Sequence, residues 1–239
     1  MMKRIVIASG KGGVGKSTAA VEIGKALAQT KRVLLIDCDP GINTLSILLD
    51  RTDAVFSWAD AAAGRCEGKE AVVRTDEKLD LLPAPNSRPD HAARDMITKA
   101  ISDLLADYDY LIFDAPAGLG EGLLRAAADA DLAVILATAD DVSVRGAGKT
   151  AELLTDNGID DCRLLLNRYS VKAAKKGLLL TVDEAMERTF LRLLGVVPED
   201  KTLGPAGQQK PNSPARQAFR RAADRLDGKN VPFLLSKIK

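Results

Sequence analysis

Residues 10–17 read Gly-Lys-Gly-Gly-Val-Gly-Lys-Ser, which fills every fixed position of the phosphate-binding pattern G-x-x-x-x-G-K-[ST]. The apolar run Ile5–Ala8 precedes this loop and predicts a buried strand, and the helix-favouring segment Lys16–Gln29 follows it. Glycines let successive backbone N–H groups turn toward one anion, and the N-terminus of the following helix adds partial positive charge. The stretch therefore predicts a loop that binds a nucleoside triphosphate.

Two lysines and a serine give this loop its chemistry. We expect Lys16 to reach the β- and γ-phosphates and the Ser17 hydroxyl to ligate Mg²⁺. Lys11 is an additional cation inside the loop, and it repels Lys16 unless a polyanion lies near both. The predicted phosphate-binding residues are Gly10, Lys11, Gly12, Gly13, Val14, Gly15, Lys16, Ser17 and Thr18.

The rest of the chain predicts a single α/β domain around this loop. With 239 residues, 46% of them hydrophobic, the chain can bury a full core. Apolar runs alternate with helical segments, which indicates a mostly parallel, doubly wound sheet with helices on both faces. The runs are Ile5–Ala8, Val33–Ile36, Leu79–Leu82, Tyr110–Phe113, Leu132–Ala137, Arg163–Leu166 and Leu193–Val197. Helices are expected over Val144–Leu154 and from Pro214 to Gly228, the latter capped by Ser213.

Acidic residues follow two of the predicted strands. Asp37 and Asp39 come after Val33–Ile36, and Asp114 comes directly after Tyr110–Phe113. In this fold ligands lie beyond the carboxyl ends of the strands. A carboxylate buried there without a cation is unfavourable, so we expect Asp114 to hold Mg²⁺, directly or through water.

Lys11–Thr18 resembles the deviant Walker A loop of the MinD/ParA family of P-loop ATPases. The resemblance implies that Lys11 crosses a nucleotide-sandwich dimer and contacts the partner subunit's ATP. It also implies that Asp39 orients or activates the attacking water, and that Asp37 supports the magnesium shell. Lys11, Lys16 and Asp39 are therefore the expected catalytic residues, and Ser17, Asp37 and Asp114 the expected metal residues.

Further segments extend the resemblance from Lys3 to about Phe233. Asp114-Ala115-Pro116-Ala117-Gly118 is similar to the D-x-P-A-G switch II segment of MinD-like members, which assigns Pro116, Ala117 and Gly118 to that switch. Asn167 and Arg168 resemble the adenine-recognition position, with the Asn167 amide offering donor and acceptor to the base. Leu194–Asp200 resembles the family's L-G-V-I-P-E-D loop, which packs beside the base and here includes Pro198, Glu199 and Asp200. Residues 140–145 are similar to the segment that opens the helix at the family's partner-facing surface.

The resemblance implies an ATP- and Mg²⁺-dependent switch that dimerises with ATP, is released by partner-stimulated hydrolysis and positions the cell-division site. The alternatives are a flagellar-placement ATPase of the same family and a ParA-like segregation ATPase that binds DNA through Arg216, Arg220, Arg221 and Arg225. Iron–sulfur carriers and glutamine-dependent amide synthases share the loop. The chain lacks the paired cysteines of the former and has no room for the amidotransferase domain of the latter.

The C-terminal end differs in charge from the rest of the chain. Residues 210–239 hold eight Lys or Arg against two Asp, which suggests an anionic partner such as lipid or nucleic acid. We expect an ATPase domain over residues 1–228 and a short tail over 229–239, which either makes weak peripheral membrane contact or packs back through Phe233–Leu235. Three dispersed cysteines and no apolar run near membrane-spanning length indicate a cytoplasmic protein, at most peripheral on the inner membrane face.

Overall fold

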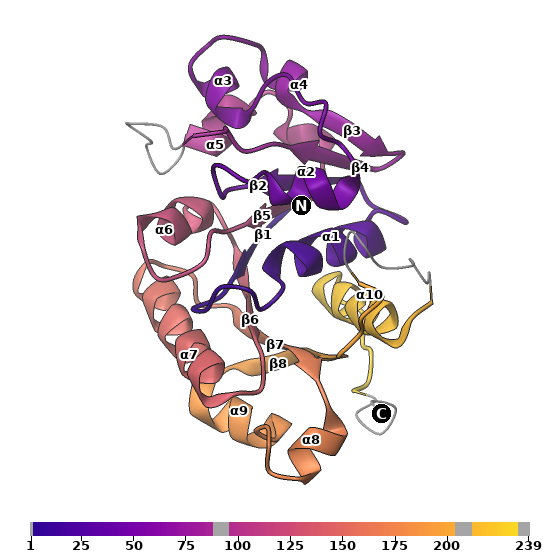
Figure 1. Ribbon diagram of the computed structural model, residues 1–239. Helices are drawn as coiled ribbons and strands as arrows, with labels where there is room; N and C mark the ends of the chain where they lie inside the picture. Colours follow the sequence, from indigo (N-terminus) through magenta and orange to yellow (C-terminus); the bar gives the residue numbers. More distant parts are fainter. Residues whose placement is uncertain (1, 88–95, 204–211, 234–239) are drawn as a thin grey trace.

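The computed structural model describes residues 2–87, 96–203 and 212–233, and an eight-stranded sheet runs through its centre (Figure 1). The sheet order is β3-β4-β2-β5-β1-β6-β7-β8, and every neighbouring pair is parallel except β3 with β4. The strands are β1 (Lys3–Ala8), β2 (Val33–Asp37), β3 (Val73–Asp76), β4 (Leu79–Leu82), β5 (Tyr110–Asp114), β6 (Leu132–Ala137), β7 (Cys162–Tyr169) and β8 (Arg192–Pro198).

Helices cover both faces of this sheet, so the predicted doubly wound fold is confirmed (Figure 1). The helices are α1 (Lys16–Leu27), α2 (Thr44–Leu49), α3 (Trp58–Ala62), α4 (Gly68–Ala71), α5 (Met96–Ala100), α6 (Glu121–Ala127), α7 (Asp141–Asp156), α8 (Val171–Lys175), α9 (Val182–Thr189) and α10 (Pro214–Leu226), with a 3₁₀ turn at Leu105–Asp107. One core layer packs α1 and α10 on the sheet through Ile23 and Phe219, and the other packs α6 and α7 through Leu123 and Val144.

All seven predicted apolar runs are strands, and the three predicted helical segments correspond to α1, α7 and α10. Helix α7 is longer than expected because Asp140, at its N-cap, accepts a hydrogen bond from Ser143 N. Ser213 caps α10 in the predicted way by accepting from Arg216 N. Strand β3 was not predicted, because Val73–Asp76 is short, partly charged and incompletely buried, as is usual for an edge strand.

Arg225 on α10 fastens the described part of the C-terminal tail to the domain. Its guanidinium donates to the backbone carbonyls of Leu194, Val231 and Pro232 at 2.8–2.9 Å. The same group lies 4.0 Å from the centroid of the Phe233 ring. The tail therefore packs back as far as Phe233, and the rest of the predicted tail, residues 234–239, lies outside the described residues. None of the described helices is both long and apolar enough to cross a membrane.

Candidate nucleotide site

The phosphate-binding loop joins β1 to α1 at the carboxyl edge of the sheet, as predicted. Gly13 and Gly15 have φ angles of 76° and 100°, which side-chain-bearing residues rarely adopt. A Cβ at Gly15 would lie 2.6 Å from Asn167 Nδ2, and a Cβ at Gly10 would lie 2.4 Å from the carbonyl oxygen of Gly146. The loop is therefore closely packed between the end of β7 and helix α7, and these contacts require glycine.

The two lysines of the loop occupy different environments. Lys16 is buried, its Nζ donates to Ser9 Oγ at 3.1 Å, and burial lowers its pKa while Asp114 and Asp39 partly raise it. Lys11 is 44% exposed, and its Nζ lies 3.3 Å from Asp140 Oδ1. Lys16 is thus fixed inside the loop, whereas Lys11 sits at the surface and reaches sideways to the N-terminus of α7.

Asp37 and Asp114 lie side by side as register partners on β2 and β5. Both are buried, and loss of solvation raises the pKa of Asp114 to about 7 and the pKa of Asp37 to about 6. The Asp37 carboxylate accepts hydrogen bonds from Asp39 N at 3.0 Å and Leu45 N at 3.2 Å. Asp37 therefore shapes the loop after β2, and that loop exposes Asp39 to solvent.

The surroundings of Asp114 fit a magnesium ion. Its Oδ1 is buried without a hydrogen-bond partner, and its carboxylate is hydrogen-bonded to the Ser17 side chain. In the described parts of the chain, no three His, Cys, Asp or Glu side chains are grouped so that they could hold a metal by themselves. Mg²⁺ usually takes one or two protein ligands and completes its shell with phosphate and water. Ser17 and Asp114 suit that mode of binding.

The predicted switch II residues lie against the phosphate loop. Ala115 N donates to Ile7 O at 3.1 Å, and Gly118 N donates to Ser9 O at 3.3 Å. Gly118 has a φ of 98°, so the chain turns sharply at this point. The segment from Ala115 to Gly118 is therefore hydrogen-bonded to the end of β1 and to Ser9, directly before the phosphate loop.

A cavity of about 260 Å³ opens beside the loop and gathers the predicted base-binding residues. It is lined by Gly15, Thr18, Asn167, Arg168, Pro198, Glu199 and Asp200, and also by Lys201, Leu203 and Phe219, which the sequence did not single out. Phe219 comes from α10, far along the chain, and only its buried apolar spacing marked it in the sequence. The cavity adjoins the phosphate loop through Gly15 and Thr18, and base binding there stays a prediction.

Asn167 is engaged differently from the prediction. Its Nδ2 donates to Val14 O at 2.8 Å, and its Oδ1 accepts from Arg168 N at 3.0 Å. The amide therefore fastens the phosphate loop to the end of β7 and has only its remaining hydrogen and lone pair for a base. Its contact with adenine stays a prediction.

Trp58 is a further residue at this site that the sequence analysis missed. Its indole Nε1 donates to the backbone carbonyl of Asp37 at 2.9 Å, and the ring is buried. Through this hydrogen bond, Trp58 of α3 holds the end of β2, although it is not part of the loop that follows that strand. The only available signal was that Trp58 is the single tryptophan of the chain, which does not indicate where it packs.

The predicted row of four arginines on α10 is not a uniform basic surface. Arg216 is paired with Glu22 of α1 at 3.1 Å, where both side chains are largely buried, and Arg225 is engaged by the tail. Of the four, only Arg220 is exposed, and Arg221 is half-buried. The expectation that all four share a phosphate-contacting flank is therefore wrong, because two of them stabilise the fold.

Together, the parallel sheet, the glycine loop with a buried lysine, and the paired carboxylates on β2 and β5 define a P-loop NTPase. The comparisons with known proteins specify the family. The family model described as AAA domain matches residues 2–158. The septum site-determining protein MinD of Bacillus subtilis is 34% identical over 246 residues, covering 98% of this chain and 92% of the relative.

Solved structures agree. The chain matches a MinC:MinD cell division protein complex of Aquifex aeolicus with a TM-score of 0.88 and 32% identity, over 97% of this chain and 98% of the other. It matches the septum site-determining protein MinD of Pyrococcus horikoshii complexed with Mg-ADP with a TM-score of 0.82 and 26% identity, over 95% and 96%. The chain belongs to the MinD/ParA family of P-loop ATPases, on its MinD side, and is an ATP hydrolase.

Proposed function

We propose that this protein is a Mg²⁺-dependent ATPase switch that dimerises on ATP, is released by partner-stimulated hydrolysis and acts in placing the cell-division site. The observation that carries the proposal is the position of Lys11. Its ammonium is exposed and held by a single surface carboxylate, Asp140. Surface ion pairs contribute only about 0.2–1 kcal/mol, so Lys11 can exchange Asp140 for the phosphates of a second subunit at small cost.

The site residues divide the chemistry of hydrolysis. The loop amides and Lys16 hold the β- and γ-phosphates, and Lys11 of the partner subunit adds positive charge as the γ-phosphate separates. Mg²⁺, held through Ser17 and Asp114, would neutralise charge on the phosphates. Asp39, exposed on the loop after β2, orients the attacking water. Asp37 positions Asp39 through its bond to the Asp39 backbone.

Three variants test this assignment. Asp39→Ala should keep ATP-dependent dimerisation and lose turnover, and Lys11→Ala should lose stimulated hydrolysis. Lys172→Ala, an exposed lysine on α8, is the matched control and should behave as wild type. The measurements are ATP turnover and sedimentation in ATP and ADP, with and without a MinC-type protein, the partner named in the Aquifex aeolicus complex, as candidate activator. Normal turnover in Asp39→Ala would refute its role.

The division-site role rests on the relatives: the Bacillus subtilis protein is named a septum site-determining protein, and the Aquifex aeolicus structure is a MinC:MinD cell division protein complex. We propose the corresponding organisation here: an ATPase domain over residues 1–228 and a tail over 229–239. The tail packs on the domain as far as Phe233, and we propose that the part beyond Phe233 makes weak peripheral contact with the inner face of the membrane. Co-sedimentation with anionic liposomes, with the full chain and with a chain truncated after Gly228, tests this in ATP and in ADP. ATP-dependent pelleting that disappears on truncation supports it, and pelleting that survives truncation contradicts it.

A further inference from the structure

Phe190, the residue that ends α9, is unusual in two ways. Its side chain is 94% exposed, and its backbone has a φ of 56°, in the left-handed region that glycine or asparagine normally occupies after a helix. Neither burial of the ring nor the backbone conformation favours phenylalanine here. A single exposed ring is common on protein surfaces, so its meaning depends on what lies beside it.

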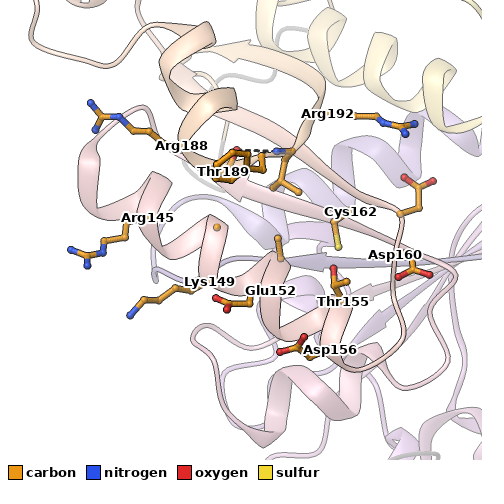
Figure 2. Close-up of a pocket in the computed structure, with 15 residues that line it drawn as sticks. Arg145, Lys149, Glu152, Thr155, Asp156, Asp160, Cys162, Arg188, Thr189 and Arg192 are labelled. Atoms are coloured by element: carbon orange, nitrogen blue, oxygen red, sulfur yellow. Dashed lines mark hydrogen bonds between the residues drawn. The ribbon is translucent and has the colours of Figure 1, made fainter.

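A groove of about 880 Å³ adjoins Phe190. It lies between α7 and the turn from α9 to β8, and Ala151, Cys162 and Leu191 contribute apolar lining (Figure 2). Cys162 and Arg192 begin β7 and β8, so the groove reaches the amino ends of these strands. The base cavity lies at their carboxyl ends. The groove is therefore separate from the nucleotide site.

Helix α7 presents an ordered stripe of charges to this groove. Arg145, Lys149, Glu152 and Asp156 follow one another at spacings of four, three and four residues, and all four are exposed and line the groove. Figure 2 shows the two cations toward one end of the groove and the two carboxylates toward the other. Within the described ranges, none of the four forms an ion pair.

The order of these charges is not explained by the helix itself. The macrodipole favours acidic residues near the N-terminus and basic residues near the C-terminus, whereas α7 has acidic Asp156 and no basic residue in its last turn. The pattern is, however, self-complementary. Arg145 and Asp156 are equally distant from the midpoint between Lys149 and Glu152.

An antiparallel pairing of two α7 helices about that midpoint therefore sets Lys149 against the partner's Glu152, and Arg145 against the partner's Asp156. We propose that this groove is a second self-association surface, at which two copies of the chain pair through α7 and each Phe190 ring packs into the groove of the other copy. A two-fold contact uses the same patch on both copies, which such a charge pattern satisfies.

The other charges around the groove fit this arrangement. Arg188 is paired with Asp141 and Arg163 with Asp161, so these four charges are satisfied within one copy. Arg192 and Asp160 remain at the rim near the acidic end (Figure 2). Because the ion pairs are exposed, the contact is weak, sensitive to salt and independent of nucleotide. If ATP also forms the proposed sandwich dimer, two such grooves on each dimer would link dimers into longer assemblies.

The test uses the full chain with Mg²⁺ and ADP, so that the ATP-dependent dimer does not contribute. Sedimentation over a range of concentrations should show self-association at about 50 mM salt that weakens about tenfold at about 500 mM. Lys149→Glu and Glu152→Lys should each weaken it about tenfold, and the double reversal should restore it because opposite charges face each other again. Phe190→Asn should also weaken it about tenfold without lowering the melting temperature, since asparagine tolerates the left-handed conformation.

Lys175→Glu on α8 makes the same charge change at an exposed position outside the groove and is expected to leave association unchanged. A wild-type chain that stays monomeric at low salt up to the highest concentration overturns the proposal. Single reversals without effect, or a double reversal as weak as the single ones, also overturn it and leave the groove to a different partner. Dimerisation of Lys149→Glu in ATP is measured separately. It shows whether the proposed ATP-dependent dimer still forms when self-association through α7 is weakened.

Discussion

The ammonium group of Lys11 and the carboxylate of Asp140 lie 3.3 Å apart, and the same carboxylate caps helix α7 through Ser143 N. The Asp140 side chain therefore binds both Lys11 in the phosphate loop and the N-terminus of α7, the helix that follows β6. Thr138 Oγ1 also donates to Asp140, which keeps the carboxylate in place. Departure of Lys11 toward a second subunit would leave the cap intact and uncover Asp140.

Asp140→Asn should strengthen ATP-dependent dimerisation. Asparagine caps helices as well as aspartate does, so α7 should keep its N-terminus, while the ion pair to Lys11 is lost. Both side chains are more than one third exposed, so the pair contributes at most about 1 kcal/mol and the dimer dissociation constant should fall by no more than about fivefold. Sedimentation with a non-hydrolysable ATP analogue measures this. Weaker dimerisation with an unchanged melting temperature would argue against a holding role for Asp140.

Nucleotide-dependent stabilisation should depend on pH through Asp114 and Asp37. Their ordinary pKa is 3.8, and burial raises them to about 7 and about 6. Between about pH 4 and about pH 7 the folded protein therefore holds protons that the unfolded chain has released, so the free energy of unfolding falls as pH rises through this window. Magnesium favours the ionised carboxylates. The rise in melting temperature caused by Mg²⁺ and ADP should accordingly grow between about pH 6 and about pH 8.

Asp114→Asn supplies the control for that measurement. The amide does not titrate, so the part of the pH dependence that belongs to Asp114 should disappear, both without ligand and with Mg²⁺ and ADP. A wild-type protein whose Mg²⁺–ADP stabilisation is the same at about pH 6 and about pH 8 would show that the carboxylate does not sense the ion.

Two glycines in contact should tolerate alanine very differently. In Gly10→Ala the new Cβ would lie 2.4 Å from the Gly146 carbonyl oxygen, so backbone must shift, and we expect a loss of about 2 kcal/mol in stability and about tenfold weaker ADP binding. In Gly146→Ala the nearest atom is 3.4 Å away, and alanine gains about 1 kcal/mol of helix propensity. Thermal unfolding and ADP titration separate the two. Equal losses of stability and ADP affinity in both variants would show that the contact does not restrict Gly10 more than Gly146.

Arg225→Lys should release the start of the tail. Lysine does not reproduce the planar fork that reaches three carbonyls and the Phe233 ring, and hydrogen bonds from a charged donor contribute about 1.5–3 kcal/mol each. We expect faster proteolysis after Gly228, mapped by mass spectrometry, with the nucleotide site unaffected. Arg220→Lys changes an exposed arginine of the same helix and should be cleaved at the wild-type rate. Equally faster cleavage in both variants would show that Arg225 does not specifically hold the tail on the domain.

The sequence was sufficient for the features that depend on local pattern and insufficient for those that depend on tertiary contacts. Continuous apolar runs predicted the buried strands, and the fixed spacing of the glycine loop predicted its place between β1 and α1. Edge strand β3 was not predicted, because a partly exposed strand lacks a continuous apolar run. The arginines of α10 share a helix flank by spacing, yet Glu22 binds one of them from a distant helix, which spacing along one helix does not reveal. Asn167 was expected to hydrogen-bond to the base, whereas its side-chain amide already donates a hydrogen bond to the Val14 carbonyl of the phosphate loop.

Because the Trp58 indole is hydrogen-bonded to the carbonyl of Asp37, tryptophan fluorescence can report on the acidic loop that follows β2. Because the chain has one tryptophan, its tryptophan fluorescence comes from a single indole, which is hydrogen-bonded to the strand end that leads into the acidic loop. Any rearrangement of that loop should alter the polarity around the indole, and so its emission wavelength and quenching. The conformational cycle can therefore be followed in real time on the unmodified chain, without a dye or a labelled nucleotide.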